Sequence, residues 1–177
     1  MYEVESHKMI DIINKVLQEI IGLELTRSTR AANMECLKFG TFFSTSKDEN
    51  LYNVGEFGLH LQCPWRITNH NEIMVGSHDL YEQIDESAEY DPDFDWDIQQ
   101  GNLRDVKIGS IIANHKLVVL SITADSYGGL SILFDNQIML TVFPVISSKS
   151  DNEYWRLLDN RIDSEHQYVS TSEGYQL

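Results

Sequence analysis

No lysine or arginine occurs between Ile67 and Leu103, although this stretch carries ten carboxylates. The whole chain has 13 Lys and Arg against 28 Asp and Glu, which gives a formal net charge of −15. Nucleic acids and anionic membrane surfaces are bound through clustered basic side chains, which this chain does not provide. The deficit therefore excludes both from the expected partners and favours a basic protein or a cation. The ten carboxylates belong to Glu72, Asp79, Glu82, Asp85, Glu86, Glu89, Asp91, Asp93, Asp95 and Asp97.

Cysteines and long apolar runs are also scarce. The two cysteines, Cys36 and Cys63, cannot form a disulfide framework, and reduced thiols are typical of the cytosol. No run of about 18 apolar residues is present, the length that a membrane-spanning helix requires. The segment from Met1 to Lys8 is acidic and has no apolar signal core. The sequence therefore predicts a cytoplasmic protein without a membrane segment.

The apolar content is nevertheless sufficient for a packed core. Hydrophobic residues make up 42% and aromatic residues 10% of the 177 positions. A chain of this size and composition can bury most of its apolar surface in one body. We therefore expect a single domain over residues 1–177, with an acidic excursion at about 77–103.

One amphipathic helix is predicted from Val4 to Ile21, followed by strands. Apolar side chains recur in it at three- and four-residue spacing, Ser6 can cap its start and Gly22 can end it. Strands are predicted at Leu23–Thr29 and Met34–Phe43, and the polar segment Ser44–Asn53 is expected to be a loop. We expect the helix to pack on a sheet. Its apolar stripe contains Met9, Ile13, Val16, Leu17 and Ile20.

The middle and the last third of the chain are rich in strand signals. Phe57–Ile67 alternates between apolar and polar residues as one strand, with a hairpin partner at Glu72–Gly76. Turn dipeptides at Gly128–Gly129 and Asp135–Asn136 separate later apolar runs, which is typical of an antiparallel meander. We expect Ile108, Ile111 and Ile112 to begin that sheet. The predicted fold class is α+β: an antiparallel sheet with the N-terminal helix packed on it.

The segment Asp91–Asp97 places a carboxylate at every second position. A calcium loop counted from Asp91 requires Gly at its sixth position and Glu at its twelfth, where this chain has Trp96 and Asn102. In an extended conformation the carboxylates would face one way and the aromatic rings the other. This favours a displayed acidic strip as a partner surface, formed by Asp91, Asp93, Phe94, Asp95, Trp96 and Asp97. Ca²⁺ or Mg²⁺ at Asp91, Asp93 and Asp95 is a secondary alternative, and no other cofactor is predicted.

Catalytic signatures are missing. Pro92-Asp93 followed by Asp105-Val-Lys107 matches the loose spacing of a metal-dependent nuclease core, provided that Asp93 and Asp105 lie on adjacent strands. The acidic surroundings would repel a polyanionic substrate, which disfavours this interpretation. The six histidines form no closely spaced metal-ligand pair, and no glycine-rich phosphate loop occurs. We therefore predict no catalytic residue.

A polar group around the predicted strand at residues 57–67 is the best candidate for a small binding site. His60, Gln62 and Arg66 share one face of that strand, and Asp79 and Tyr81 follow it closely in sequence. One interpretation is a pocket for a small molecule or a metal ion, in an undetected enzyme or a binding protein. The other is a structural ion pair between Arg66 and Asp79 that fixes where the acidic excursion leaves the sheet, and we favour it.

Several blocks of the chain resemble an uncharacterised family of bacterial proteins. They are His60-Leu-Gln-Cys-Pro-Trp-Arg-Ile, Asp79-Leu-Tyr, Leu140-Thr-Val-Phe-Pro and Glu153-Tyr-Trp-Arg-Leu. The resemblance spans about residues 55 to 172 and implies a bacterial, cytosolic origin without a known activity. The final block is also similar to the β-meander ends of small bacterial immunity-like proteins.

These observations together predict a non-enzymatic, acidic protein-binding module. An immunity protein that neutralises a basic toxin is the more specific form of this hypothesis, because an acidic surface speeds the encounter with a basic partner. Aromatic side chains in the excursion would supply contact area. The alternative is a site for a small molecule or divalent metal at His60, Gln62, Arg66 and Asp79. Exposed sheet edges in the final meander make a dimer a further expectation.

Overall fold

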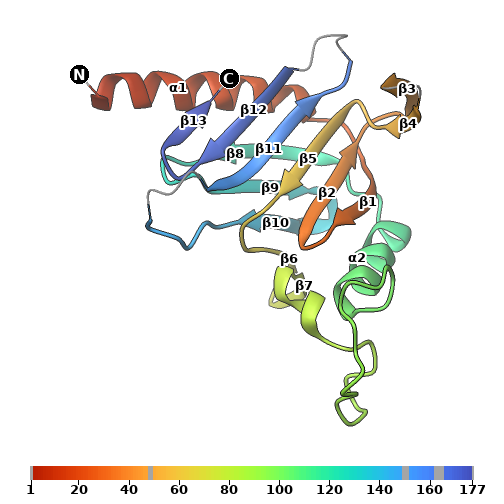
Figure 1. The fold of residues 1–177 in the computed structure, drawn as a ribbon. Helices are drawn as coiled ribbons and strands as arrows, with labels where there is room; N and C mark the ends of the chain where they lie inside the picture. The colour runs from red at the N-terminus through yellow and green to blue at the C-terminus, as the bar shows by residue number, and fades with distance from the viewer. Residues whose placement is uncertain (1, 48–49, 149–151, 162–165, 177) are drawn as a thin grey trace.

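The computed structural model describes residues 2–47, 50–148, 152–161 and 166–176. Two antiparallel sheets share one hydrophobic core and cross each other in Figure 1. The predicted α+β class is therefore confirmed, although the strands form two main sheets and a small hairpin. One sheet has the order β1 (Leu25–Ala31), β2 (Met34–Phe39), β5 (Phe57–Leu61), β11 (Glu153–Asp159), β12 (His166–Thr171) and β13 (Gly174–Gln176). The other has the order β7 (Glu72–Gly76), β6 (Trp65–Asn69), β10 (Ile138–Val142), β9 (Leu130–Phe134) and β8 (Val119–Ala124).

The N-terminal helix α1 (Tyr2–Leu17) and the 3₁₀ turn η1 (Gln18–Ile20) pack beside β8 and β13, as the sequence predicts (Figure 1). Ile13, Leu17 and Ile20 are buried in the core. Asn14 accepts a hydrogen bond from the backbone N–H of Ala124 at 2.8 Å and donates one to its carbonyl at 3.2 Å. The helix thus satisfies backbone groups on an edge of the meander. Because α1 occupies part of this edge, less of it is available to pair with a second copy of the chain. The expected dimer stays a prediction.

The expected single strand over residues 57–67 is wrong. β5 and β6 belong to different sheets, and the chain crosses between them at Gln62–Pro64. The N–H of Gln62 still bonds to the carbonyl of Tyr154, whereas the carbonyl of Pro64 already bonds to the N–H of Phe143 in the other sheet. Proline has no N–H for a sheet ladder, so the alternation continues in sequence while the pairing changes sheets.

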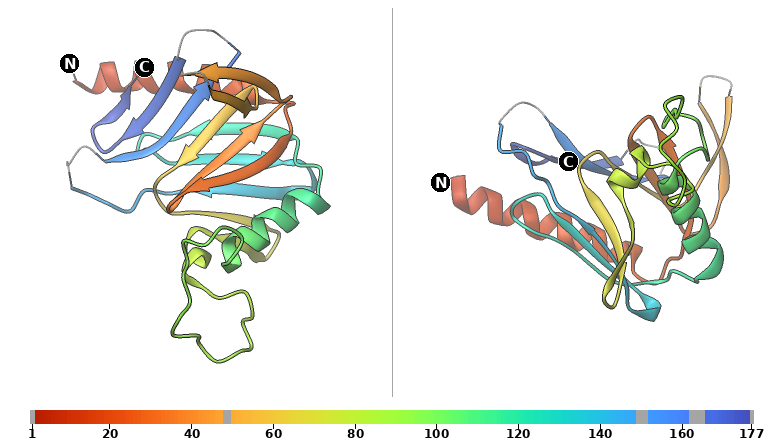
Figure 2. Two further views of the ribbon diagram at one scale, coloured as in Figure 1. Left: turned by 45° about the vertical axis from the view of Figure 1, so that its right-hand side comes forward. Right: turned by 90° about the horizontal axis from the view of Figure 1, so that it is seen from below.

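The isoleucines at positions 108, 111 and 112 do not begin a sheet, because they lie on a helix, α2 (Leu103–Asn114). Asn102 caps this helix by accepting the N–H of Asp105 at 2.9 Å. The spacing of the isoleucines is that of one helical face, and it buries Ile108 and Ile111 in the core. Helix α2 packs against β1, β7 and the 3₁₀ turn η2 (Ser77–Tyr81), as Figure 2 shows.

Two further expectations change. The polar segment 44–53 is largely a hairpin of β3 (Phe43–Lys47) and β4 (Asn50–Val54), with residues 48–49 outside the described chain. The final meander is divided: β8, β9 and β10 form a meander in one sheet, and β11, β12 and β13 form another in the other sheet. The buried indole of Trp155 donates to the carbonyl of Gly128 at 2.9 Å and links the two halves. A three-residue 3₁₀ turn, η3 (Asp135–Gln137), joins β9 to β10.

Candidate functional site

Residues 82–102, here called the acidic loop, project from the end of the molecule between η2 and α2 (Figures 1 and 2). They contain no helix or strand, and most of their side chains are exposed. Tyr90 is 70% exposed and Ile98 59% exposed. The segment therefore leaves the two sheets as an excursion, and it presents apolar groups as well as charge to solvent.

Arg30 anchors the acidic loop to the sheet. Its side chain is only 2% exposed, and its Nη2 donates to the carbonyls of Trp96, Asp97 and Ile98 at 3.2, 2.9 and 3.0 Å. Its Nε pairs with the Asp105 carboxylate at 2.9 Å. A planar guanidinium can serve several acceptors at fixed angles, so one side chain sets the backbone of the loop over three residues.

The neck of the loop is closed by the cap of α2. The side-chain amide of Asn102 donates to the carbonyl of Trp96 at 3.0 Å and to Asp105 at 3.1 Å. Asp105 also accepts the N–H of Gln100 at 3.0 Å. On the other side of the neck, the N–H of Leu103 bonds to the carbonyl of Glu82 at 2.9 Å. Both ends of the loop are thus held to the first turn of one helix.

Gln83 organises the outer part of the loop. Its Nε2 donates to the carbonyls of Asp85, Ala88 and Glu89 at 3.1, 3.2 and 3.1 Å, and its Oε1 accepts the N–H of Asp91 at 3.0 Å. The Gln83 side chain therefore holds this part of the loop together, in place of the backbone hydrogen bonds that join the two strands of a β-hairpin. Aromatic contacts add to this, with ring centroids 5.5 Å apart for Tyr81 and Trp96 and 6.4 Å apart for Tyr90 and Phe94.

Few carboxylates of the Lys- and Arg-free stretch meet a cation within the molecule. Asp97 pairs with Arg30 at 3.0 Å, and Glu86 pairs with Lys107 at 3.6 Å. The other eight have no ion pair among the described residues. Most of the negative charge of the stretch is therefore left for solvent or for a cationic partner.

The expected extended strip at Asp91–Asp97 is wrong in its backbone. Asp91 and Asp95 each use Oδ1 to accept the N–H two residues ahead, at 2.9 Å, and so form two consecutive turns. The carboxylates nevertheless face solvent, whereas Phe94 and Trp96 are half-buried. Among the described residues no three His, Cys, Asp or Glu side chains converge as metal ligands, and this includes the candidates Asp91, Asp93 and Asp95.

The nuclease pattern is not assembled either. Asp93 lies at an exposed turn of the acidic loop, and Asp105 lies in the first turn of α2 beside Arg30, so the two are not on adjacent strands. The free thiols are also unsuited to nucleophilic attack. Burial raises the pKa of Cys36 to about 11 and that of Cys63 to about 12, which keeps both protonated at neutral pH.

A second buried ion pair, between Glu35 and Arg104, lies next to the pair formed by Arg30 and Asp105. Arg104 Nε is 3.2 Å from Glu35 Oε2, but no N–H points at that oxygen, so the contact is an ion pair without a hydrogen bond. Ser28 donates to the other oxygen of Glu35. Burial raises the pKa of the Glu35 carboxyl and lowers that of the Arg104 guanidinium, since both charges have left water.

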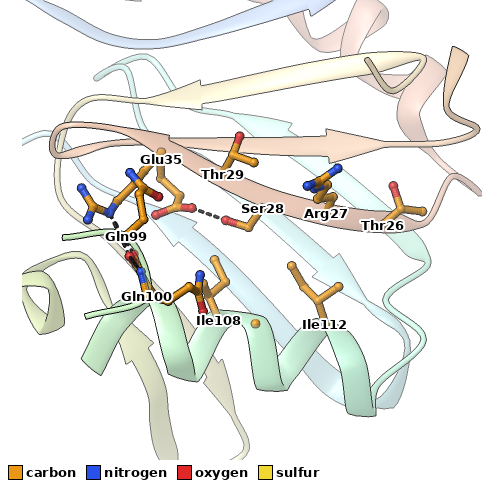
Figure 3. A pocket seen from close by; sticks show the side chains of 12 residues that line it. Thr26, Arg27, Ser28, Thr29, Glu35, Gln99, Gln100, Ile108 and Ile112 are labelled. Atoms are coloured by element: carbon orange, nitrogen blue, oxygen red, sulfur yellow. Dashed lines mark hydrogen bonds and ion pairs between the residues drawn. The ribbon is translucent and has the colours of Figure 1, made fainter. Parts of the chain in front are cut away.

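Glu35 lines a cleft of about 320 Å³ between β1 and α2, shown in Figure 3. Ser28 and the Glu35 carboxyl form one side, and Ile108 and Ile112 of α2 form the floor (Figure 3). Gln99 and Gln100 of the acidic loop close one end. The buried charges at this cleft are already paired, because Arg30 pairs with Asp105 and Arg104 with Glu35, whereas Arg27, which also lines the cleft, is exposed and forms no ion pair among the described residues.

The polar group predicted around the strand at residues 57–67 is not brought together. His60 and Arg66 lie in different sheets, and Arg66 is exposed and stacks over the ring of Phe143 at 5.5 Å. Asp79 does not pair with Arg66, since it accepts the N–H of Gly76 at 2.9 Å at the start of η2. The expected ion pair between these two residues is therefore wrong.

Gln62 and Tyr81 are the remaining two of this group, and they share one hollow. They line a small hollow of about 110 Å³ together with Arg104. The sequence reasoning missed the residues that hold the acidic loop, Arg30, Asn102 and Asp105. For Asn102 and Asp105 the signal was present, because Asn followed three residues later by an acid is typical of a helix start. For Arg30 no local pattern exists.

Comparison with known proteins adds no relative. No family model matches the chain, and neither the curated proteins nor the solved structures contain a match. The resemblance to a bacterial family therefore stays a prediction. In the described part of the chain no helix is long and apolar enough to cross a membrane.

Proposed function

We propose that this protein is a non-enzymatic binding module whose acidic loop engages a basic partner protein. The observation that carries the proposal is the contrast between the backbone and the charges of the loop. Arg30, Asn102 and Gln83 hold the backbone in place, while most carboxylates have no cationic partner in the part of the chain that the structure describes. A loop that is ordered before binding loses less conformational entropy when it meets its partner.

Exposed apolar groups in the same loop support this function. Tyr90 is exposed beside half-buried Phe94, and Ile84 and Ile98 are exposed nearby. Aromatic anchors surrounded by charge are common in protein interfaces, where the rings supply affinity and the charges supply steering and specificity. Immunity against a basic toxin is the more specific form of this proposal, and cytoplasmic location in a bacterium belongs to it.

The test removes charge without removing structure. Replacing Asp91, Asp93 and Asp95 by Asn keeps a side-chain oxygen for the turns but deletes three charges from the loop. A matched control deletes three exposed charges elsewhere, as Asp11→Asn, Glu72→Gln and Glu173→Gln. Both variants and the parent chain are used as bait for bacterial lysate at low and high salt, and retained proteins are identified by mass spectrometry.

We expect a basic protein to be retained at low salt by the parent chain and the control but not by the loop variant. Retention should fall at high salt, because exposed charges are screened over about 10 Å at 0.1 M. Equal retention by all three chains, or no basic protein at low salt, would contradict the proposal. The immunity form further requires that the retained protein is toxic when expressed alone and harmless when co-expressed.

A further inference from the structure

A hollow of about 480 Å³ lies on the face of the six-stranded sheet that is turned away from the core. We call it the basic hollow; its lining includes Arg27, Lys38, Asn53, Gly58, His60 and Asn160. Side chains alternate across a strand, so Leu37 and Leu59 point into the core while Lys38 and His60 point out. The hollow is therefore formed by the outer face of the sheet together with Asn53 of β4 and Asn160, which follows β11, and it is separate from the acidic loop.

Two like charges face each other at this hollow. Arg27 of β1 lies directly opposite Lys38 of β2 in the strand register. Like charges in such positions repel each other and destabilise the pair. No carboxylate lines the hollow, and neither Arg27 nor Lys38 forms an ion pair among the described residues. In a chain of net charge −15, such a carboxylate-free surface contrasts with the rest of the molecule.

Within the ranges that the structure describes, the immediate surroundings of Lys38 supply no negative charge. Burial and the neighbouring Arg27 lower the pKa of Lys38, as expected for an ammonium group beside another cation. Lys38 Nζ donates to the carbonyl of Asn53 at 3.2 Å, a neutral acceptor. Other basic side chains are neutralised, for example Arg156 by Glu153 and Arg161 by Asp159. The pair at the basic hollow, in contrast, has no carboxylate partner among the described residues.

The shape of the hollow comes from a glycine. In the row Arg27, Lys38, Gly58 and Leu158 across four strands, only Gly58 has no side chain. This leaves a gap beside Lys38 into which a small group can enter. A Cβ added at Gly58 would lie 3.6 Å from Leu158 Cδ1 and 3.7 Å from Asn160 Nδ2, which is ordinary contact. An alanine side chain therefore fits at Gly58 without a clash.

His60 lies beside this gap, in the next row of the sheet, between Cys36 and Arg156. Burial lowers the pKa of His60. The positive charges of Arg156 and Lys38 lower this pKa further, whereas the negative charge of Glu153 raises it. Its imidazole is therefore neutral at neutral pH and can donate one hydrogen bond from a ring nitrogen. The hollow thus combines two cations, one ring donor and the side-chain amide of Asn160.

We propose that the basic hollow binds a small anionic molecule through a carboxylate or phosphate group placed between Arg27 and Lys38, with His60 as a hydrogen-bond donor. An anion there relieves the repulsion between the two cations and forms charge-assisted hydrogen bonds with both. The gap at Gly58 admits the group to the sheet surface. This site is independent of the partner-binding role of the acidic loop.

The experiment measures binding of two probes, inorganic phosphate and succinate, at pH 7.5 and constant ionic strength. Amide chemical shifts of the full chain are followed by NMR as each probe is added. We expect saturable shifts around Lys38, Gly58 and His60, and the stronger of the two probes identifies the preferred anionic group. Absence of saturable shifts with both probes would overturn the proposal.

Variants separate specific binding from a general salt effect. The double substitution Arg27→Gln with Lys38→Gln should weaken binding about tenfold or more, because two charge-assisted contacts are lost. Gly58→Ala adds a methyl group to the gap without changing charge and should also weaken binding. Lys116→Gln, an exposed charge away from the hollow, should leave affinity within about twofold. Circular dichroism verifies that each variant is folded, and unchanged affinity in both site variants would overturn the site.

Discussion

Arg30 holds Asp97 twice, by an ion pair to its carboxylate at 3.0 Å and by a hydrogen bond to its carbonyl at 2.9 Å. The Asp97 side chain is 59% exposed, whereas that of Arg30 is 2% exposed. A buried cation on the first strand thus fixes the backbone of an exposed acidic segment. The conformation of the acidic loop therefore depends on a residue of the sheet and not on the loop alone.

Arg30→Met should destabilise the fold and release the loop. The substitution leaves the Asp105 carboxylate buried without its cation, which typically costs about 3–5 kcal/mol. Urea unfolding measures the loss, and amide exchange should accelerate at residues 96–98. Arg66→Met is the control, because Arg66 is exposed and only stacks on Phe143, and it should cost about 1 kcal/mol or less. Equal losses for the two variants would contradict the anchoring role.

Gln83→Ala should loosen the acidic loop without unfolding the protein. The side chain makes four hydrogen bonds that all stay within the exposed loop. Global stability should therefore change by about 1 kcal/mol or less, since local opening does not require the core to open. Limited proteolysis should cut the variant faster between residues 82 and 100. Gln62→Ala, at an exposed glutamine outside the acidic loop, should leave the cleavage rate unchanged.

Gly128→Ala should be costlier than Gly22→Ala. Both glycines have a positive φ, +84° and +86°, which alone costs an alanine about 1–2 kcal/mol. At Gly128 the new Cβ would also lie 2.7 Å from Tyr154 Cδ2, whereas at Gly22 nothing lies within 4 Å. Overpacking adds about 1–3 kcal/mol, so Gly128→Ala should lose about 2 kcal/mol or more in thermal or urea unfolding. A smaller loss at Gly128 than at Gly22 would be inconsistent with the packing described.

Glu35 should give stability an unusual pH dependence. Its pKa in the folded protein is raised above 4.5, so between 4.5 and that raised pKa the folded state holds a proton that the unfolded state has lost. Stability from this group is therefore present at low pH and decreases as pH rises through the window. Glu35→Gln removes the titration. The stability of the parent relative to Glu35→Gln should fall as pH rises above 4.5, and a constant difference would argue against burial as the cause.

The differences between the expected and observed structure have physical causes that can be located. At Pro64 the alternation of apolar residues continues although the backbone changes sheets. The alternation indicates which side chains are buried, but it does not indicate which strands are hydrogen-bonded to each other. At Asn102–Asp105 the cap of α2 was visible, but short isoleucine runs fit a strand or a helix equally. The prediction that His60 and Arg66 share one strand face is wrong for the same reason, because the predicted strand is divided between two sheets.

Two features followed from the chain alone: the absence of basic residues over 67–103 and the amphipathic stripe of α1, because charge and local periodicity are properties of neighbours in sequence. Only tertiary structure decided that Arg30, 66 residues before Trp96, would enter the neck of the acidic loop, and that Arg27 would oppose Lys38 across two strands. Contacts between distant residues depend on sheet register and on packing against a shared core. No local pattern specifies either, which is why the anchor and the basic hollow are products of the fold.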